Sequence, residues 1–413
     1  MKKFFVLLTL SIIIIIAVLS FSGCVQDTPN TDDEQEYYMP KKCVYTNGKY
    51  LYDENDEVLM LRGTNIGNWL VPEGWMGIIN IDGQNDDVDG EKLTFKKMMK
   101  AFDDNENNFT KSQIDELLDI YYSNWFSEQD VKFIKDSGFN CIRLPFGYFN
   151  VADDDGNLTD GIKWIDLCLE WCQKYQIYCI LDLHGAYGSQ NKEHHSGDDT
   201  QCILFDDEEC QRKTVKLWCE IAKRYKDNNY VLGYDLLNEP KGNTNKTIEP
   251  QHVFHNELYQ AIRQVDNKHI IIIESCWEFT DFPDISRFGW ENVLYQMHMY
   301  NFEDDNTWYL TSHIFTYMGS IQLKDKPILI GEFCLGMNNL ELVINTFEDK
   351  SFSWTSWAYK TNDRGGWGMR NLKMDRVNIS HATFDEIAEC FRNSKSENAT
   401  ISNEFNTLLD ILK

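Results

Sequence analysis

The feature that most constrains the fold of this chain is a series of eight short apolar segments spread along most of its length. Strands buried on both faces of a parallel sheet read as continuous apolar runs rather than as alternating patterns, and these segments have that character. Eight parallel strands, most of them followed by a helix, form a closed (β/α)8 barrel. We therefore predict an α/β protein with a TIM-barrel fold and strands at residues 57–65, 139–146, 178–184, 231–239, 269–275, 293–300, 327–333 and 352–359.

Several segments between the expected strands have helical periodicity. Residues 161–175 place Trp164 and Cys172 on one apolar face, and residues 211–226 show the same spacing. A further helix is expected to begin after Ser127, because serine is a favoured capping residue, and to end at the next glycine. These helices alternate with the expected strands, as the barrel requires.

A doubly wound open sheet is the alternative architecture. Such sheets usually carry a glycine-rich phosphate-binding turn after the first strand. The corresponding turn here, GTNIGNWLVPEGW at residues 63–75, lacks that spacing and is rich in aromatic residues. Residues 74–110 form a long insertion after the first strand, and we expect them to be a loop over the mouth of the barrel.

The composition excludes some classes of partner. The chain has 39 Lys and Arg against 66 Asp and Glu, a formal charge of −27, which repels nucleic acid and anionic lipid headgroups. A neutral ligand such as a sugar is compatible with this charge, and we expect no nucleic-acid partner. Residues 193–198, EHHSGD, hold two adjacent histidines that we expect to form hydrogen bonds rather than to bind a metal ion. We predict neither a metal nor a cofactor.

The N-terminal residues read as an export signal. Residues 1–23 have a basic start and a long apolar run, and Cys24 follows in FSGC, which resembles the lipobox of exported lipoproteins. We expect residues 1–23 to be a signal peptide, Cys24 to be lipidated, residues 24–40 to be a flexible tether and residues 41–413 to be the catalytic domain. Because the apolar run is nearly long enough to span a bilayer, an uncleaved signal anchor and simple secretion are the alternatives. All of them place the protein outside the cell, either secreted or attached to the membrane.

The chain has 12 cysteines, and their spacing is irregular. Removing Cys24 leaves an odd number, and most of the remaining cysteines lie in helical or strand patterns, so we expect them to be small core residues. Cys202 and Cys210 flank a polar loop and are the expected disulfide.

Polar residues gather at the ends of the expected strands, where barrel active sites lie. Glu239 ends the fourth strand and Glu332 ends the seventh, so a closed barrel brings them across one pocket although 93 residues separate them in the sequence. Retaining glycosidases need two carboxyl groups about 5–5.5 Å apart. The strand ends together supply Arg143, His184, Asn238, Glu239, His298, Tyr300, Glu332 and Trp357.

These residues lie in motifs that resemble glycoside hydrolase family five, a family of retaining (β/α)8 glycosidases. The motifs are IRLP, DLHGAYGSQN, NEP, MHMY, GEF and SWAY, in that order along residues 61–370. The resemblance implies that Glu239 is the acid/base and Glu332 the nucleophile. It further implies that Asn238 binds the sugar 2-hydroxyl, that Arg143 and Tyr300 orient Glu332, and that His184, His298 and Trp357 line the site of the reacting sugar.

The substrate follows less directly from the resemblance. NWLVPEGW and DLHGAYGSQN resemble the exo-β-1,3-glucanase branch of the family, which implies that Glu73 contacts the terminal glucose and that Asn191 belongs to the substrate site. GGWGM at residues 365–369 resembles cellulase-like members, so a β-1,4 linkage is also open. Trp69, Trp75 and Trp367 are candidate stacking residues or core residues.

We expect the charges of the two glutamates to differ. Arg143 should lower the pKa of Glu332 and keep it ionised, whereas burial beside another carboxylate should keep a proton on Glu239. The expected function is extracellular hydrolysis of β-1,3- or β-1,4-glucans by a monomer. A catalytically silent carbohydrate-binding lipoprotein is the alternative, and a serine esterase is disfavoured because no GxSxG motif is present.

Overall fold

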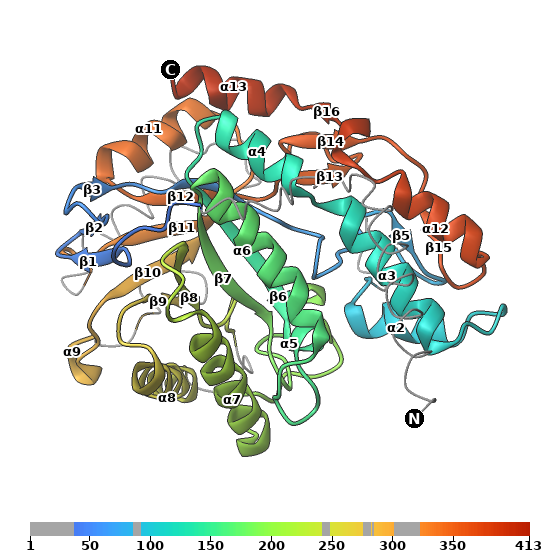
Figure 1. Ribbon diagram of the computed structural model, residues 1–413, viewed down its shortest axis with the longest axis horizontal. Coiled ribbons are helices and arrows are strands. Elements are labelled where there is room, and N and C mark those ends of the chain that lie inside the picture. The colour runs from blue at the N-terminus through green and yellow to red at the C-terminus, as the bar shows by residue number, and fades with distance from the viewer. Residues whose placement is uncertain (1–36, 86–91, 242–247, 276–281, 283–284, 301–322) are drawn as a thin grey trace, which may run out of the picture. The chain divides into compact units, whose positions relative to one another are not determined.

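The structure is a computed structural model that describes residues 37–85, 92–241, 248–275, 282, 285–300 and 323–413. From Tyr38 to Lys413 the described residues belong to one compact unit. Its centre is a closed barrel of eight parallel strands, with helices around the outside (Figure 1). The barrel strands, in the order in which they pair, are β4 (Arg62–Asn65), β6 (Cys141–Gly147), β7 (Tyr178–Gly185), β8 (Val231–Asp235), β9 (Ile270–Glu274), β10 (Val293–His298), β11 (Ile328–Glu332) and β12 (Ser353–Ser356), and β12 pairs with β4.

The predicted barrel is therefore confirmed, and the open sheet is wrong. All eight predicted segments contain a barrel strand, although the first one is divided. Its first part, β3 (Val58–Leu59), pairs antiparallel with β2 (Tyr50–Tyr52), which pairs with β1 (Tyr45–Asn47), and only its second part enters the barrel as β4.

The helices follow the strands, and their ends agree with local sequence signals. The helix expected after Ser127 is α4 (Glu128–Asp136), where Ser127 and Asp130 form a capping box. The chain leaves this helix through Gly138, whose φ of 88° is accessible to glycine. The other described helices are α2 (Phe95–Asp103), α3 (Lys111–Trp125), α5 (Tyr148–Val151), α6 (Lys163–Tyr175), α7 (Glu208–Tyr225), α8 (Glu249–Val265), α9 (Ile285–Phe288), α11 (Leu340–Lys350), α12 (Phe384–Arg392) and α13 (Asn403–Ile411), with short 3-10 turns η1 (Asp160–Ile162), η2 (His194–Ser196) and η4 (Ser396–Asn398).

The insertion at residues 74–110 is more ordered than the expected loop. It contains β5 (Ile79–Asn80) and the helix α2, whose N-terminus is capped by Thr94. β5 pairs with β15 (Val377–Asn378) from the C-terminal part of the chain. A second small sheet is formed by β13 (Lys360–Asn362), β14 (Arg370–Leu372) and β16 (Thr400–Ile401).

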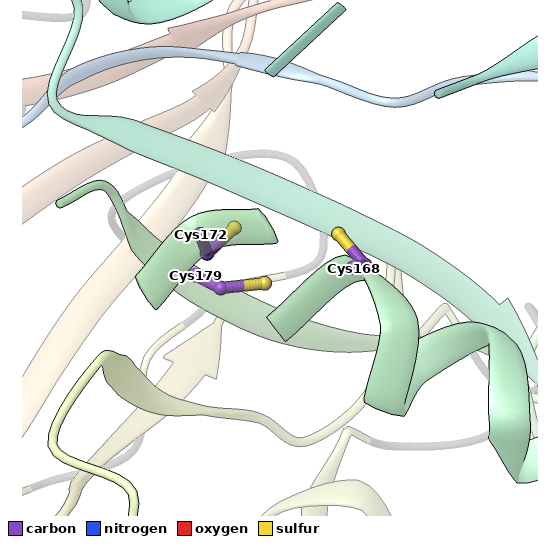
Figure 2. Close-up of side chains that lie close together, drawn as sticks. All are labelled: Cys168, Cys172 and Cys179. Carbon is purple, nitrogen blue, oxygen red and sulfur yellow. The ribbon is translucent and has the colours of Figure 1, made fainter. Parts of the chain in front are cut away.

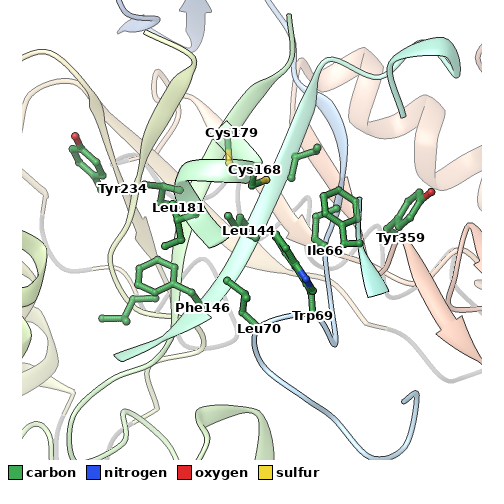
Figure 3. Close-up of a cluster of buried hydrophobic side chains, with 14 of the residues drawn as sticks. Ile66, Trp69, Leu70, Leu144, Phe146, Cys168, Cys179, Leu181, Tyr234 and Tyr359 are labelled. Carbon is green, nitrogen blue, oxygen red and sulfur yellow. The ribbon is translucent and has the colours of Figure 1, made fainter. Parts of the chain in front are cut away.

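Apolar side chains fill the barrel and pack the helices against it. Near the amino ends of the strands, one cluster contains Leu61, Cys141, Ile180, Leu232, Ile270, Leu294 and Leu329, one residue from or beside each of seven strands. A larger cluster lies between the strands and the helices, and Figure 3 shows a part of it around Leu144, Phe146 and Leu181. The barrel interior is therefore a packed core toward this end, as the fold requires.

The described cysteines are free thiols, and most of them are buried in the core, as predicted. The predicted disulfide is wrong, because Cys202 and Cys210 are both free. Cys168 and Cys172 of α6 and Cys179 of β7 place their sulfur atoms within 4.8 Å of one another (Figure 2). Because all three belong to the apolar core cluster, where thiolates would be desolvated, we interpret them as packing residues.

The expected signal peptide at residues 1–23, the lipidated Cys24 and most of the tether at residues 24–40 lie outside the described residues. Among the helices of the described part of the chain, none combines the length and apolar character that a membrane crossing needs.

We predict that the contact between β4 and β6 leaves no room for a side chain at Gly63. A Cβ atom at this position would lie 2.3 Å from the carbonyl oxygen of Cys141 on β6. Gly63→Ala should therefore force two barrel strands apart and lower the free energy of unfolding by about 1–3 kcal/mol, measured by chemical denaturation. The control is Gly365→Ala, where nothing lies within 4 Å of the added atom, and its change should stay within about 0.5 kcal/mol. Equal stability of the two variants would contradict the close strand contact.

Candidate active site

Strand register brings the polar residues together at the carboxyl ends of the barrel strands. His298 of β10 lies opposite Glu332 of β11, and Asp182 of β7 lies opposite Asp235 of β8. Alternate residues of a strand share a face, so Asp182 and His184 point to the same side of β7. The barrel interior is thus apolar near its amino end and polar near its carboxyl end.

The two glutamates meet at this end of the barrel. Glu239 follows β8, Glu332 ends β11, and both are buried. One carboxylate oxygen of each lies within 4.8 Å of the other and of a ring nitrogen of His298. This separation suits a retaining glycosidase, in which the carboxyl groups are about 5–5.5 Å apart. Glu239 has a φ of 43°, a left-handed conformation that is uncommon outside glycine and that often occurs at functional sites.

Arg143 is completely buried, and it links the residues around it. Its Nη1 donates to Oε1 of Glu332 at 2.8 Å and to Oδ1 of Asn65 at 2.9 Å. Its Nη2 donates to Oδ1 of Asn238 at 2.9 Å, and its Nε donates to Oδ2 of Asp235 at 2.8 Å. A guanidinium group has only donors and a fixed geometry, so Arg143 holds the candidate nucleophile and Asn238 in a fixed relation.

Further acidic groups surround this guanidinium. Asp182 Oδ1 lies 3.1 Å and Glu274 Oε2 lies 3.9 Å from Nη2 of Arg143. Gln296 donates through Nε2 to Oδ2 of Asp235 and to Oε2 of Glu274, both at 3.0 Å. Burial raises the pKa of Asp182 to about 7 and that of Asp235 to about 6, although Arg143 opposes both shifts.

Glu332 has a second donor, and its pKa differs from the sequence expectation. Tyr300 donates through its hydroxyl to Oε2 of Glu332 at 2.7 Å. Burial nevertheless raises the pKa of Glu332 to about 7, against the lowering effects of His298 and Arg143. Arg143 lowers the pKa of Glu332 as predicted, but desolvation of the carboxylate outweighs the charge of the guanidinium, so the net shift is upward.

Glu239 lies between two histidines, and its pKa also differs from the expectation. Oε1 lies 2.9 Å from Nδ1 of His298, and Oε2 lies 3.1 Å from Nε2 of His195. Burial acts to raise the pKa of Glu239, but the hydrogen bonds of His195 and His298 hold it well below its ordinary value. The expectation that burial would raise the pKa of Glu239 and keep it protonated is therefore wrong in direction.

His184 and Trp357 form one side of the site. The ring of His184 stacks on that of Trp357, with centroids 5.4 Å apart and an interplanar angle of 11°. His184 Nδ1 lies 2.7 Å from Oδ2 of Asp182. Burial and the neighbouring cations His195 and Arg143 hold the pKa of His184 well below its ordinary value, so its ring is neutral.

Glu73 lies in a second group of polar and aromatic residues. Its Oε2 accepts a hydrogen bond from Nε1 of Trp75 at 2.8 Å and lies 3.0 Å from Nε2 of His194. Trp367 packs edge to face on Trp75, with ring centroids 4.9 Å apart, and lies 5.7 Å from the ring of Tyr300. Trp75, Tyr300 and Trp367 are partly exposed, and Tyr300 connects this aromatic group to Glu332.

The structure does not support two of the expected substrate contacts. Trp69 has no exposed surface and lies in the core cluster (Figure 3). It donates through Nε1 to the carbonyl of Tyr122 and stacks on Trp171, so of its two predicted roles the core role is confirmed and the substrate-stacking role is wrong. Asn191 is also fully buried, and its Nδ2 donates to the backbone carbonyl of Glu239 at 3.0 Å. Its amide supports the Glu239 backbone, which differs from the sugar contact that we predicted.

Several residues of this network were not predicted from the sequence as members of the site. Asp182 and Asp235 interrupt apolar strands, and a charged residue inside such a run was the available signal. His194 and His195 were expected to form hydrogen bonds, and they do so, but their partners Glu73 and Glu239 are distant in the sequence. Among the residues that were overlooked are Asn65, Asp182, His195, Asp235, Glu274 and Gln296.

The convergence of Glu239, His298 and Glu332 is also compatible with a metal site by distance alone. Oε1 of Glu332 accepts a hydrogen bond from Arg143, and Oε2 accepts one from Tyr300. Because both oxygens already have donors and a buried guanidinium lies beside them, we interpret the group as a hydrogen-bonded acid/base site.

Comparisons with known proteins agree with this geometry. The chain is 31% identical over 266 residues to a beta-xylosidase of Phanerodontia chrysosporium, which covers 62% of this chain and 51% of the relative. It is 30% identical to a glucan 1,3-beta-glucosidase of Candida oleophila, covering 61% of this chain and 60% of the relative. For endoglucanase C of Acetivibrio thermocellus the identity is 31%, and the shares are 44% and 52%. The chain thus spans between half and two thirds of the length of these curated relatives.

Solved structures share the fold. A beta-glucanase from Saccharophagus degradans matches with a TM-score of 0.51 and 17% identity, over 86% of this chain and 93% of that one. A rutinosidase from Aspergillus niger matches with a TM-score of 0.56 and 14% identity, over 81% and 98%. At these identities the likeness concerns the fold alone.

The family model described as cellulase (glycosyl hydrolase family 5) matches residues 71–363. This region begins after β4, contains Arg143 and both glutamates, and covers most of the chain. The chain therefore belongs to glycosyl hydrolase family 5.

Proposed function

We propose that this protein hydrolyses β-linked glucans with retention of anomeric configuration. The observation that carries the proposal is the approach of the Glu239 and Glu332 carboxylates to within 4.8 Å at the carboxyl end of the barrel. That separation allows Glu332 to attack the anomeric carbon from one side while Glu239 serves the leaving oxygen on the other. Relatives named as a glucan 1,3-beta-glucosidase and as an endoglucanase support a glucan as the substrate class.

The surrounding residues fit a double displacement. In the first step Glu332 forms a bond to the anomeric carbon, and the bond to the leaving oxygen breaks as Glu239 supplies its proton. In the second step Glu239 takes a proton from water, which attacks the same carbon and releases Glu332. Arg143 and Tyr300 hold the two oxygens of Glu332 in place. Asn238, whose Oδ1 is occupied by Arg143, keeps its Nδ2 as a donor, which suits a contact to the sugar 2-hydroxyl.

The remaining site residues fit sugar recognition. Trp357 lies beside His184, Trp367 is partly exposed beside Tyr300, and Glu73 is a buried acceptor beside Trp75. Burial acts to raise the pKa of Glu73, but the hydrogen bond from His194 lowers it, so an ionised carboxylate is available to sugar hydroxyls. Both β-1,3- and β-1,4-linked glucans remain substrates of the proposal, and a panel of laminarin and carboxymethyl cellulose with product sizing assigns the linkage. We propose that the domain acts as a monomer.

We predict that replacing Glu332 and replacing Glu239 have different effects on the kinetics of hydrolysis. Glu332→Ala should abolish hydrolysis of every substrate. Glu239→Ala should lower glucan hydrolysis by about 10²–10⁴-fold but should keep rapid glycosylation by dinitrophenyl glycosides, because an activated leaving group needs little acid assistance. Burst and steady-state kinetics measure both effects, and NMR of the first-formed product should show the retained anomer. An inverted product would contradict the mechanism. Wild-type protein that is as inactive as Glu332→Ala on a broad glycan panel would favour a carbohydrate-binding module.

We predict a pH dependence that follows from Glu332. Its carboxylate must be ionised to attack, and burial raises its pKa to about 7. For an activated aryl glucoside, which does not need the Glu239 proton, kcat/KM should be constant above this pH. It should fall about tenfold for each pH unit below it, because the protonated carboxyl is not nucleophilic. A profile that stays flat down to pH 5 would contradict this pKa for Glu332 in the free enzyme.

We also propose export and lipid attachment, which the sequence of residues 1–24 supports. We predict that Cys24→Ser abolishes incorporation of labelled fatty acid and moves the protein out of the membrane fraction of the expressing cells. Fractionation with a lipid label measures both. If the variant remains in the membrane fraction at its unprocessed mass, the uncleaved signal anchor is the correct alternative. If the wild type is soluble outside the cell, simple secretion is the correct alternative.

A further inference from the structure

His195 lies beside Glu239 but has no role in the double displacement described above. His195 belongs to the short turn η2, in the loop that follows β7, and only 11% of its side chain is exposed. Its Nε2 lies 3.1 Å from Oε2 of Glu239, the carboxylate oxygen that His298 does not contact. The candidate acid/base thus has one histidine on each oxygen.

The hydrogen-bond network places a hydrogen on Nε2 of His195. Arg143 has only donors, so Asn238 must present its Oδ1 to Arg143 and its Nδ2 elsewhere. Nδ2 lies 3.3 Å from Nδ1 of His195, and a neutral ring accepts this hydrogen bond at Nδ1 and therefore carries its own hydrogen on Nε2. A cationic ring also carries one there. In either protonation state His195 donates toward Glu239.

The loop that carries His195 is tied to the backbone of Glu239. Asn191 donates through Nδ2 to the carbonyl of Glu239, and its Oδ1 accepts from the backbone N–H of Glu193, two residues before His195. The hydroxyl of Ser196 donates to the carbonyl of Glu193 at 2.8 Å, and the carbonyl of Gly197 accepts from the backbone N–H of Lys96 at the start of α2. These bonds on both sides of His195 hold its ring against Glu239.

We propose that His195 is a positioning residue whose Nε2–H stabilises the ionised form of Glu239, and thereby sets the pH range in which Glu239 acts as a base. The role of Glu239 rests on the proposed function, but the contact itself does not. A hydrogen bond to a carboxylate favours its charged form, and hydrogen bonds to charged groups are stronger than neutral ones. The contact therefore favours the second step, in which Glu239 must be ionised to accept a proton from water.

Other titratable groups near Glu239 and His195 act on both of them and must be held constant in a test. They are Arg143, Asp182, His184, Glu274, His298 and Glu332 from the barrel strands, and Glu73, His194 and Tyr300 from the adjoining segments. None of these residues is changed when His195 alone is replaced.

A direct titration of Glu239 tests the proposal without depending on catalysis. Glutamate labelled with carbon-13 at the side-chain carboxyl is incorporated into Glu332→Gln protein, and the Glu239 signal is assigned by its loss in Glu239→Gln. His195→Leu removes the donor, whereas His195→Gln keeps an N–H at a similar reach. We expect the pKa of Glu239 to rise by about 1–2 units in the Leu variant and to stay within about 0.5 unit in the Gln variant. An unchanged pKa in the Leu variant, or equal shifts in both, would overturn the proposal.

Kinetics in the otherwise unaltered protein provide the second readout. For an activated aryl glucoside whose turnover is limited by hydrolysis of the glycosyl enzyme, kcat falls when Glu239 becomes protonated. His195→Leu should move this fall to a pH about 1–2 units higher than in His195→Gln, whereas a merely structural role would lower kcat without moving it. If wild-type protein turns over no glycoside, the proposed function fails, and the titration alone still decides the role of His195.

Discussion

The site depends on one buried cation. Arg143 has no exposed surface, and removing a charge from water costs several kcal/mol unless partners replace the lost hydration. Its partners come from four barrel strands or from the residues just after them: Asn65, Asp182, Asp235, Asn238 and Glu332. Because these partners are far apart in the sequence, the ion pairs of Arg143 form only when the barrel closes. Folding of the domain and assembly of the site are therefore the same event.

This arrangement also explains why the pKa values of the two glutamates shift in opposite directions. Several acidic groups share the positive charge of Arg143. Its effect on Glu332 is therefore smaller than the effect of desolvation, which raises the pKa of that carboxylate. Each carboxylate oxygen of Glu239 contacts one histidine. Nδ1 of His298 lies closer to Glu239, at 2.9 Å, than to Glu332, at 3.4 Å. The two histidines thus favour negative charge on Glu239.

The barrel supplies the position of these groups, and the segments after the strands supply their surroundings. His194 and His195 lie in the loop after β7, and Trp75 lies in the insertion after β4. Such segments vary within one fold without disturbing the core. The likeness to enzymes named for different glycosidic bonds is consistent with a common catalytic centre and different walls.

The sequence by itself determined the barrel, the order of its eight strands and the pair of glutamates. It could do so because buried parallel strands require continuous apolar runs, and because the end of each strand is visible where polar residues begin. It could not determine that Trp69 faces the core or that Asn191 binds the Glu239 backbone, since a residue type next to a motif does not fix the direction of its side chain. Only the tertiary structure decided the contacts of His195 and the directions of the pKa shifts of the two glutamates. Both depend on burial and on distances between segments that are remote along the chain, and neither quantity is encoded in local sequence pattern.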